Sequence, residues 1–163
     1  MNLPLRRFAF LVIFVAGCVS AADQVQRTRE GPRADEIWTA RFVRDYGRAP
    51  SFDERRSWRD ELDEQIGEYL RTHPDVGTSP RASQFRFQRR AQVGMSEDEV
   101  SLLLGAPESR TEDSATMKTA AGTFWSSVQV RAREMWVYPS DWRLYFADGR
   151  LVDITVGGRA SLD

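Results

Sequence analysis

Residues 134–156 have the sequence EMWVYPSDWRLYFADGRLVDITV, and no other part of the chain restricts the architecture as strongly. Three aromatic and β-branched runs, 134–138, 142–146 and 150–156, are separated by the turn-forming segments 139–141 and 147–149. Runs of this composition joined by such short turns are typical of antiparallel strands. We therefore expect a three-stranded antiparallel meander at the end of the chain.

The last hairpin allows two registers. A two-residue Asp148-Gly149 turn places Leu144 opposite Asp153, which would put a carboxylate on an apolar face. A three-residue loop with Gly149 in the left-handed conformation avoids this, and we prefer it. It pairs Leu144 with Val152, Trp142 with Ile154 and Arg143 with Asp153. The side chains facing the helices would be Trp142, Leu144, Phe146, Val152 and Ile154; those facing outward would be Arg143, Tyr145, Leu151 and Asp153.

Helical patterns precede these strands. Apolar residues recur at helical spacing from Ile37 to Tyr46, and Gly47 and Pro50 end that segment. Residues 79–90 are ambiguous, because the alternation around Phe85 suits a strand whereas a Ser-Pro start suits a short helix, which we favour. Residues 113–132 keep a helical period and predict a single lid-like helix.

Two capping boxes predict two further helices. Ser51 and Ser96 each have a glutamate three residues later, Glu54 and Glu99. The apolar residues that follow recur at helical spacing as far as a proline at position 74 and a Gly-Ala-Pro at 105–107.

The start of the chain has the pattern of a bacterial lipoprotein signal. Arg6 and Arg7 precede the apolar run 8–16, and small residues precede Cys18, the only cysteine. We expect cleavage before Cys18 and acylation of its thiol, with more than one acyl chain needed for stable attachment. One alternative is an uncut membrane anchor, for which the run is short against the ~20 residues that a bilayer requires. Another is a secretory signal cut after Ala21.

Size and charge restrict the class of protein. Removal of residues 1–17 from the 163 leaves 146, enough for one domain with a sizeable core. Arg6 and Arg7 leave with the signal, so the 23 basic residues become 21 against 24 acidic ones, which gives no global attraction to nucleic acid. With Cys18 acylated, neither a disulfide nor a thiolate metal site can form within one chain.

Residues 92–156 resemble the SmpA/OmlA domain, the BamE-like family of small outer-membrane lipoproteins. The resemblance rests on Val93-Gly94-Met95-Ser96, Glu99-Val100, Leu103-Leu104-Gly105 before Pro107, Trp136-Val137-Tyr138, Leu144-Tyr145-Phe146 and Gly149-Arg150-Leu151-Val152. It implies two helices on one face of a three-stranded antiparallel sheet and a non-enzymatic accessory role in β-barrel protein insertion, with contacts to other lipoproteins and anionic lipid. Val19 after Cys18, in place of the aspartate that retains enteric lipoproteins at the inner membrane, implies an outer-membrane location.

These observations divide the chain into four parts. We expect a signal peptide at 1–17, a flexible tether at 18–33, a helical extension at 34–91 and the BamE-like α+β domain at 92–158. The tether is inferred because residues 21–33 are polar, contain Gly31-Pro32 and show no periodicity. The predicted fold class is thus α+β, with helices packed on one face of a small three-stranded antiparallel sheet after a helical extension.

Few residues are candidates for a site, and no catalytic, metal or cofactor site is predicted. His73 lies at a helix end, where an imidazole typically interacts with the terminal carbonyls. The five acidic residues from Asp60 to Glu68 fit a solvated helix face, aided by Arg56 and Arg71. Cys18 remains as the lipidation site.

Two candidate binding patches remain. Arg86, Arg89 and Arg90, with Arg81 and interleaved phenylalanines, suit phospholipid head groups or an acidic partner, or else simply keep a helix face solvated. Tyr145 and Leu151, on the expected outward face of the sheet, are the candidates for a partner-binding patch.

The expected function is that of a lipid-anchored accessory subunit, facing the periplasm from the outer membrane, in β-barrel protein assembly or envelope integrity. Its partners would be the membrane, through the lipid, and other envelope proteins, with no nucleic acid, small-molecule substrate or cofactor. The alternatives are an inhibitor-like or regulatory module that binds an envelope enzyme, and an enzyme of unknown class, which requires a deep pocket with convergent polar groups. The alternative location is secretion to the periplasm.

Overall fold

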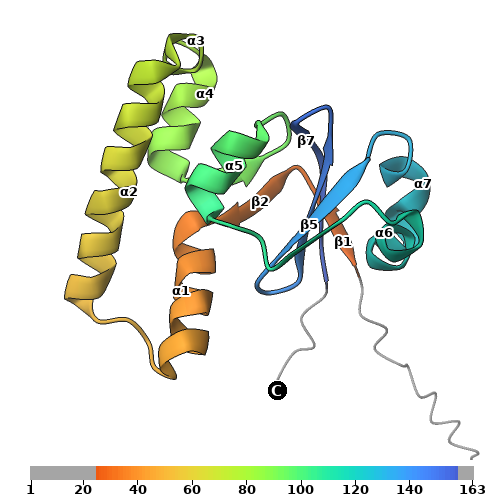
Figure 1. Ribbon diagram of the computed structural model, residues 1–163, viewed down its shortest axis with the longest axis horizontal. Coiled ribbons are helices and arrows are strands. Elements are labelled where there is room, and N and C mark those ends of the chain that lie inside the picture. Colours follow the sequence, from red (N-terminus) through yellow and green to blue (C-terminus); the bar gives the residue numbers. More distant parts are fainter. Residues whose placement is uncertain (1–24, 158–163) are drawn as a thin grey trace, which may run out of the picture.

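The computed structural model describes residues 25–157, except for the side chains of Pro80, Arg81 and Gln84. A five-stranded antiparallel sheet lies at its centre, with helices on both faces (Figure 1). The sheet has the order β1-β7-β6-β5-β4, with bounds Gln26–Thr28 for β1, Ser109–Thr111 for β4, Glu134–Tyr138 for β5, Trp142–Ala147 for β6 and Arg150–Val156 for β7. A separate two-stranded sheet pairs β2 (Glu30–Arg33) with β3 (Arg90–Gln92).

The expectation of a small three-stranded sheet with helices on one face is wrong. β5, β6 and β7 form the meander, but β4 adds to one edge of it and β1 to the other. β1 and β2 come from the segment that we expected to be a flexible tether. Gly31 of β2 is needed for close packing, because a Cβ there would lie 3.1 Å from the Cβ of Ala91 on β3.

The helices that precede β4 in the chain all lie on the side of the first face of the sheet (Figure 1). These are α1 (Ala34–Tyr46), α2 (Phe52–Thr72), α3 (Pro74–Gly77), α4 (Pro80–Ser83), the π-helical turn η1 (Gln84–Gln88) and α5 (Glu97–Leu104). The main core joins Ile37, Leu62 and Val100 of these helices to Leu144 and Phe146 of β6. The ambiguous segment 79–90 is therefore mostly helical and ends in a strand.

Both capping boxes are confirmed. The Ser51 hydroxyl accepts the backbone N–H of Glu54, and the Glu54 carboxylate accepts that of Ser51, at the start of α2. Ser96 and Glu99 do the same at the start of α5, where the carboxylate lies 2.7 Å from the Ser96 nitrogen. α1 ends as expected at Gly47, which has a φ of 68°.

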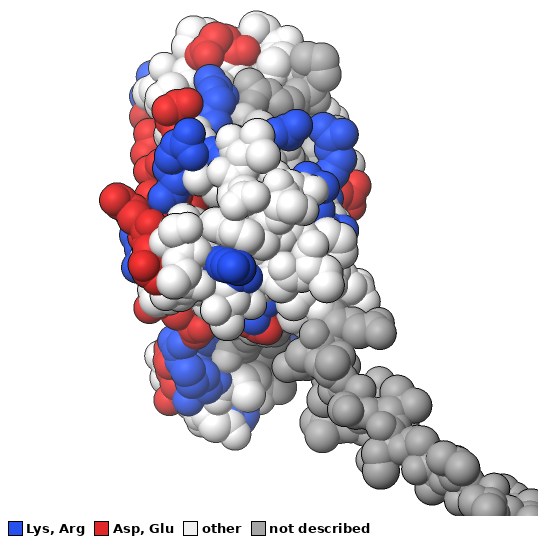
Figure 2. All heavy atoms as spheres, turned by 90° about the vertical axis from the view of Figure 1, so that its right-hand side faces the viewer, with Lys and Arg blue, Asp and Glu red and all other residues white. Residues whose placement is uncertain are grey.

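The second face of the sheet is covered by α6 (Ser114–Ala121), the 3₁₀ turn η2 (Gly122–Phe124) and α7 (Trp125–Val128). Met117 and Val128 pack here on Met135 and Tyr145 in a second, smaller core. The single lid-like helix expected here is wrong, because the helix breaks at Gly122, whose φ of 54° an L side chain rarely adopts. The exposed side of these elements has few charged groups (Figure 2).

The register of the β6–β7 hairpin also differs from the expectation. Asp148 and Gly149 both have positive φ, 51° and 70°, and form the two-residue turn that we disfavoured. A bulge then shifts the pairing, so that Leu144 lies opposite Ile154 and not opposite Asp153. The bulge thus keeps Asp153 from lying opposite Leu144, which was the reason for preferring the three-residue loop.

The bulge also redistributes side chains between the faces. Trp142, Leu144, Phe146 and Ile154 pack on the first face as expected. Leu151 packs there too, whereas Val152 lies on the second face, the reverse of the prediction. Asp153 does not face solvent but is buried beside Arg27 of β1.

Candidate partner-binding surface

Aromatic side chains form a continuous line along α1 and the start of α2. Trp38, Phe42 and Tyr46 follow one another at i, i+4 spacing, with ring centroids 5.3 Å and 4.5 Å apart. Trp58 of α2 stacks on Trp38 at 4.8 Å. We call Trp58, Trp38, Phe42 and Tyr46 the aromatic ladder.

The ladder leaves the core as α1 proceeds. Ala34 and Ile37 at the start of α1 are buried, Trp38 and Phe42 are half-buried, and Tyr46 is 67 % exposed. Phe52, at the start of α2, is 72 % exposed. Large exposed aromatic groups such as these are typical of interaction surfaces.

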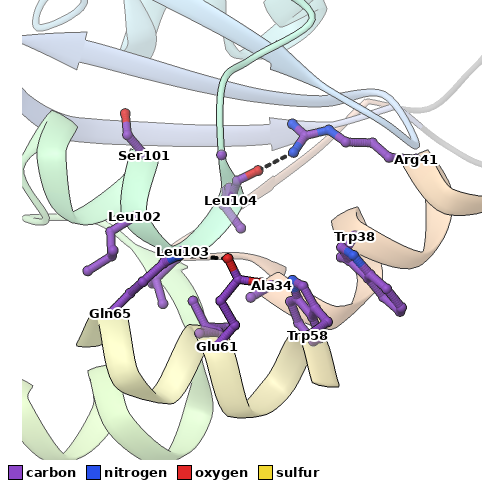
Figure 3. Close-up of a pocket in the computed structure, with 12 residues that line it drawn as sticks. Ala34, Trp38, Arg41, Trp58, Glu61, Gln65, Ser101, Leu102, Leu103 and Leu104 are labelled. Carbon is purple, nitrogen blue, oxygen red and sulfur yellow. Dashed lines mark hydrogen bonds between the residues drawn. The ribbon is translucent and has the colours of Figure 1, made fainter. Parts of the chain in front are cut away.

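A hollow of about 470 Å³ lies beside the ladder, between α1, α2 and α5 (Figure 3). Trp38 and Trp58 form its apolar side, and Leu102 to Leu104 of α5 form the opposite wall. Arg41 fixes this geometry, since its guanidinium donates to the carbonyls of Leu104 and Ala106, both at 2.5 Å. A cation at the carboxyl end of α5 also interacts favourably with the helix dipole.

A second hollow continues along α2 and shares Glu61, Gln65 and Leu102 with the first. Its rim is acidic: Glu61 accepts a hydrogen bond from Gln65, and neither Glu61 nor Glu64 forms an ion pair within residues 25–157. Tyr69 lines it too, and desolvation raises the pKa of its phenol, which stays neutral at physiological pH. The combined groove has apolar walls and a carboxylate rim.

The predicted arginine patch is only partly assembled. Arg89 donates to both carboxylate oxygens of Asp63, at 2.6 and 2.7 Å, and Arg90 pairs with Glu30 at 2.9 Å. Arg86 is exposed and forms no ion pair with any described residue. Arg86 and Arg89 line a third hollow, of about 340 Å³, together with Arg33, Asp35, Arg59 and Phe87, whereas Arg90 lies outside it.

Tyr145 and Leu151, predicted to form an outward-facing patch, are not exposed. Tyr145 is completely buried and Leu151 is 1 % exposed, because both faces of the sheet are covered and the bulge turns Leu151 into the main core. The Tyr145 hydroxyl lies 3.1 Å from Oγ1 of Thr155, inside the protein. Cys18, the predicted lipidation site, lies outside the described residues.

His73 and two of the acidic residues of α2, the titratable groups considered in the sequence, form contacts within the protein. His73 is at the end of α2 as expected, with its Nδ1 3.0 Å from the carbonyl oxygen of Tyr69. The pairs Arg56–Asp60 and Arg71–Glu68 on α2 are present at 3.8 and 2.5 Å. Among residues 25–157, no group of three or more His, Cys, Asp or Glu side chains is placed to hold a metal ion.

Sequence reasoning missed the ladder as a surface. The spacing of Trp38, Phe42 and Tyr46 correctly indicated a helix, but the same spacing describes a buried stripe and an exposed one. No sequence pattern marks Phe52 as a surface residue, since it is a single apolar residue between the N-cap Ser51 and the charged first turn of α2. Only the tertiary arrangement shows which aromatic groups remain in contact with water.

Comparison of the chain with protein-family models, with curated proteins and with solved structures found no significant match. No helix within residues 25–157 combines the length and the hydropathy needed to span a bilayer.

Proposed function

We propose that this chain is a lipid-anchored accessory lipoprotein, exported to the outer membrane and facing the periplasm. It acts as a non-enzymatic binding or scaffolding subunit in envelope assembly, of the kind that the SmpA/OmlA resemblance implies. The export pattern around Cys18 supports the location. The observation that carries the binding role is the aromatic ladder, which ends in the exposed Tyr46 close in sequence to the exposed Phe52.

The ladder suits the docking of a protein partner. Aromatic side chains supply large contact areas and dominate the binding energy of many interfaces. Tyr46 and Phe52 would anchor the partner, while the groove between α2 and α5 would accept an apolar side chain from it. The unpaired rim carboxylates Glu61 and Glu64 would favour a partner with basic residues beside that apolar group, because opposite charges steer association.

The proposal is tested by crosslinking and mass spectrometry on native membranes. The test variant is Tyr46→Ser with Phe52→Ser, and the matched control is Phe87→Ser, which removes an aromatic group that is 80 % exposed outside the ladder. We expect the double variant to recover at least about tenfold less of the envelope partner, since hot-spot side chains contribute ≥ 2 kcal/mol. Phe87→Ser should recover it as the unaltered chain does.

Two results would contradict the proposal. One is equal recovery of the partner by the double variant and the unaltered chain. The other is recovery of no envelope protein by the unaltered chain. Thermal unfolding of each variant shows whether a loss of partner reflects lost folding, which we do not expect because the substituted groups are exposed. Cys18→Ser, run in parallel, shows whether anchoring is needed for the complex.

A further inference from the structure

The surface formed by α6, η2 and α7 is unusually poor in charge. Lys118 is the only charged residue from Ser114 to Val130, whereas 11 of the 21 residues of α2 are charged. Val130 is 71 % exposed and Trp125 is half-buried at the edge of this surface. Figure 2 shows a broad uncharged area on this side of the molecule, interrupted by isolated basic groups.

Basic side chains lie next to this surface. Arg29 and Arg131 line a hollow together with Phe124 of η2, and both are exposed. Neither forms an ion pair within the described part of the chain, whereas their neighbour Arg27 is bound to Asp153. The surface therefore carries a single charged group from Ser114 to Val130, Lys118, and has beside it two cations that form no ion pair with a described residue.

The described chain begins against the same surface. A Cβ on Gly122 of η2 would lie 3.5 Å from Cγ2 of Val25, the first described residue. Cys18 precedes Val25 by seven residues, which reach at most about 25 Å when fully extended. An acyl group on Cys18 therefore holds η2 within that distance of the bilayer. Helices α1 and α2, which carry the aromatic ladder, lie on the opposite side of the sheet from α6 and α7 (Figure 1).

We propose that the α6-η2-α7 surface rests on the lipid head groups of the membrane that holds the anchor, an inference that depends on the proposed lipidation of Cys18. Partial dehydration costs a surface with a single charged group less free energy than it costs a surface with many. Trp125 is of the residue type enriched at membrane–water interfaces, and Arg29 and Arg131 suit lipid phosphates. This orientation directs the aromatic ladder away from the bilayer, where a partner can reach it.

The test uses the full acylated chain in vesicles of phosphatidylethanolamine and phosphatidylglycerol. Because Cys18 is the only cysteine and its thiol is acylated, an introduced cysteine is the single reactive thiol. Ser126→Cys places a fluorescent label on α7, and Ser57→Cys places the same label on α2 as the matched control; both serines are exposed. Iodide in the buffer and a nitroxide-labelled lipid in the bilayer serve as the two quenchers.

We expect iodide to quench the label at position 126 at least about threefold less than the label at position 57, as burial in the head-group layer requires. The nitroxide lipid should quench the label at 126 and leave the one at 57 unaffected. Equal quenching at both positions, on a chain that mass spectrometry shows to be acylated, overturns this inference and leaves the proposed function intact. An unmodified Cys18 overturns both. Protection from iodide without quenching by the nitroxide lipid identifies a protein as the occupant and overturns the inference.

Discussion

The pair formed by Arg27 and Asp153 is the interaction whose removal should be most informative about how β1 is held. Arg27 Nε donates to Oδ1 at 2.9 Å and to Oδ2 at 3.1 Å, and Nη2 donates to Oδ2 at 2.7 Å. The Asp153 side chain is 3 % exposed and that of Arg27 is 37 % exposed. The hydrogen bond with Asp153 raises the pKa of Arg27, so the guanidinium stays charged. The pair thereby joins the edge strand β1 to β7.

The strength of this pair follows from its burial. Separating a fully buried ion pair costs about 3–5 kcal/mol, and an exposed pair contributes about 0–1 kcal/mol. Because solvent reaches Arg27 and screens it, we expect an interaction energy of about 2 kcal/mol. Asp153→Ala should cost more than Asp153→Asn, since Asp153 Oδ1 also accepts the buried backbone N–H of Ile154 at 3.0 Å.

The assay is a double-mutant cycle with Arg27→Met and Asp153→Asn, measured by urea unfolding and followed by tryptophan fluorescence. Each single variant should lose about 2–3 kcal/mol of unfolding free energy, and the double variant should lose about 2 kcal/mol less than the sum. Arg143→Met with Asp141→Asn is the comparison cycle; this pair joins β6 to the turn before it and also has one exposed partner. A coupling below about 0.5 kcal/mol between Arg27 and Asp153 would refute the reasoning, because it would mean that packing alone retains β1.

Three further predictions concern caps and titration. Glu99→Ala removes the buried acceptor for the N-cap N–H of α5. In urea unfolding it should lower the free energy of unfolding by about 1–2 kcal/mol. This loss should exceed that of Glu54→Ala, because the cap of α2 is exposed. The side-chain hydrogen bonds from Arg48 and the backbone hydrogen bond from Ser51 lower the pKa of Glu54 to about 2. The stabilisation of the folded state by Glu54 is therefore complete above about pH 5 and is lost as the pH falls towards 2. Melting temperatures of Glu54→Gln and the unaltered chain should converge over that range, and a constant difference would contradict this. Burial raises the pKa of Tyr138 and Tyr145, so the folded state loses stability as the pH rises above about 10, and their phenolate absorbance should appear only as the protein unfolds.

The elements that the sequence predicted well are those specified by neighbouring residues. The boxes at Ser51 and Ser96 are confirmed because every atom of a capping box lies within four residues. The meander of β5, β6 and β7 is confirmed for a similar reason, since short turns join its strands. The helix over α1 and its glycine stop follow from the spacing of aromatic groups and from Gly47.

The elements that were missed depend on distant partners. β1 has only three residues and shows no alternation of apolar and polar side chains. Its first residue, Gln26, pairs with Val156 at the other end of the chain. The bulge in the last hairpin is accompanied by a long-range contact, because the Asp153 carboxylate pairs with Arg27, 126 positions earlier in the chain. The exposure of Tyr46 depends on how far α1 extends beyond α5, a distance that no local pattern encodes. Tyr145 was misplaced because helices α6 and α7 cover a face that we expected to be open.

The brevity of the outermost strands has a consequence for the chain when it is concentrated. Within residues 25–157, β1 and β4 form the two edges of the large sheet, and each has three residues. So short an edge strand offers few unpaired backbone N–H and C=O groups to a strand of another molecule. Edge-to-edge pairing of two copies therefore forms few hydrogen bonds at either edge. If the proposed lipid anchor holds the protein to a membrane, its copies meet at high local density, where such pairing would be most damaging. The same two strands that complete the sheet thus also protect it against polymerisation.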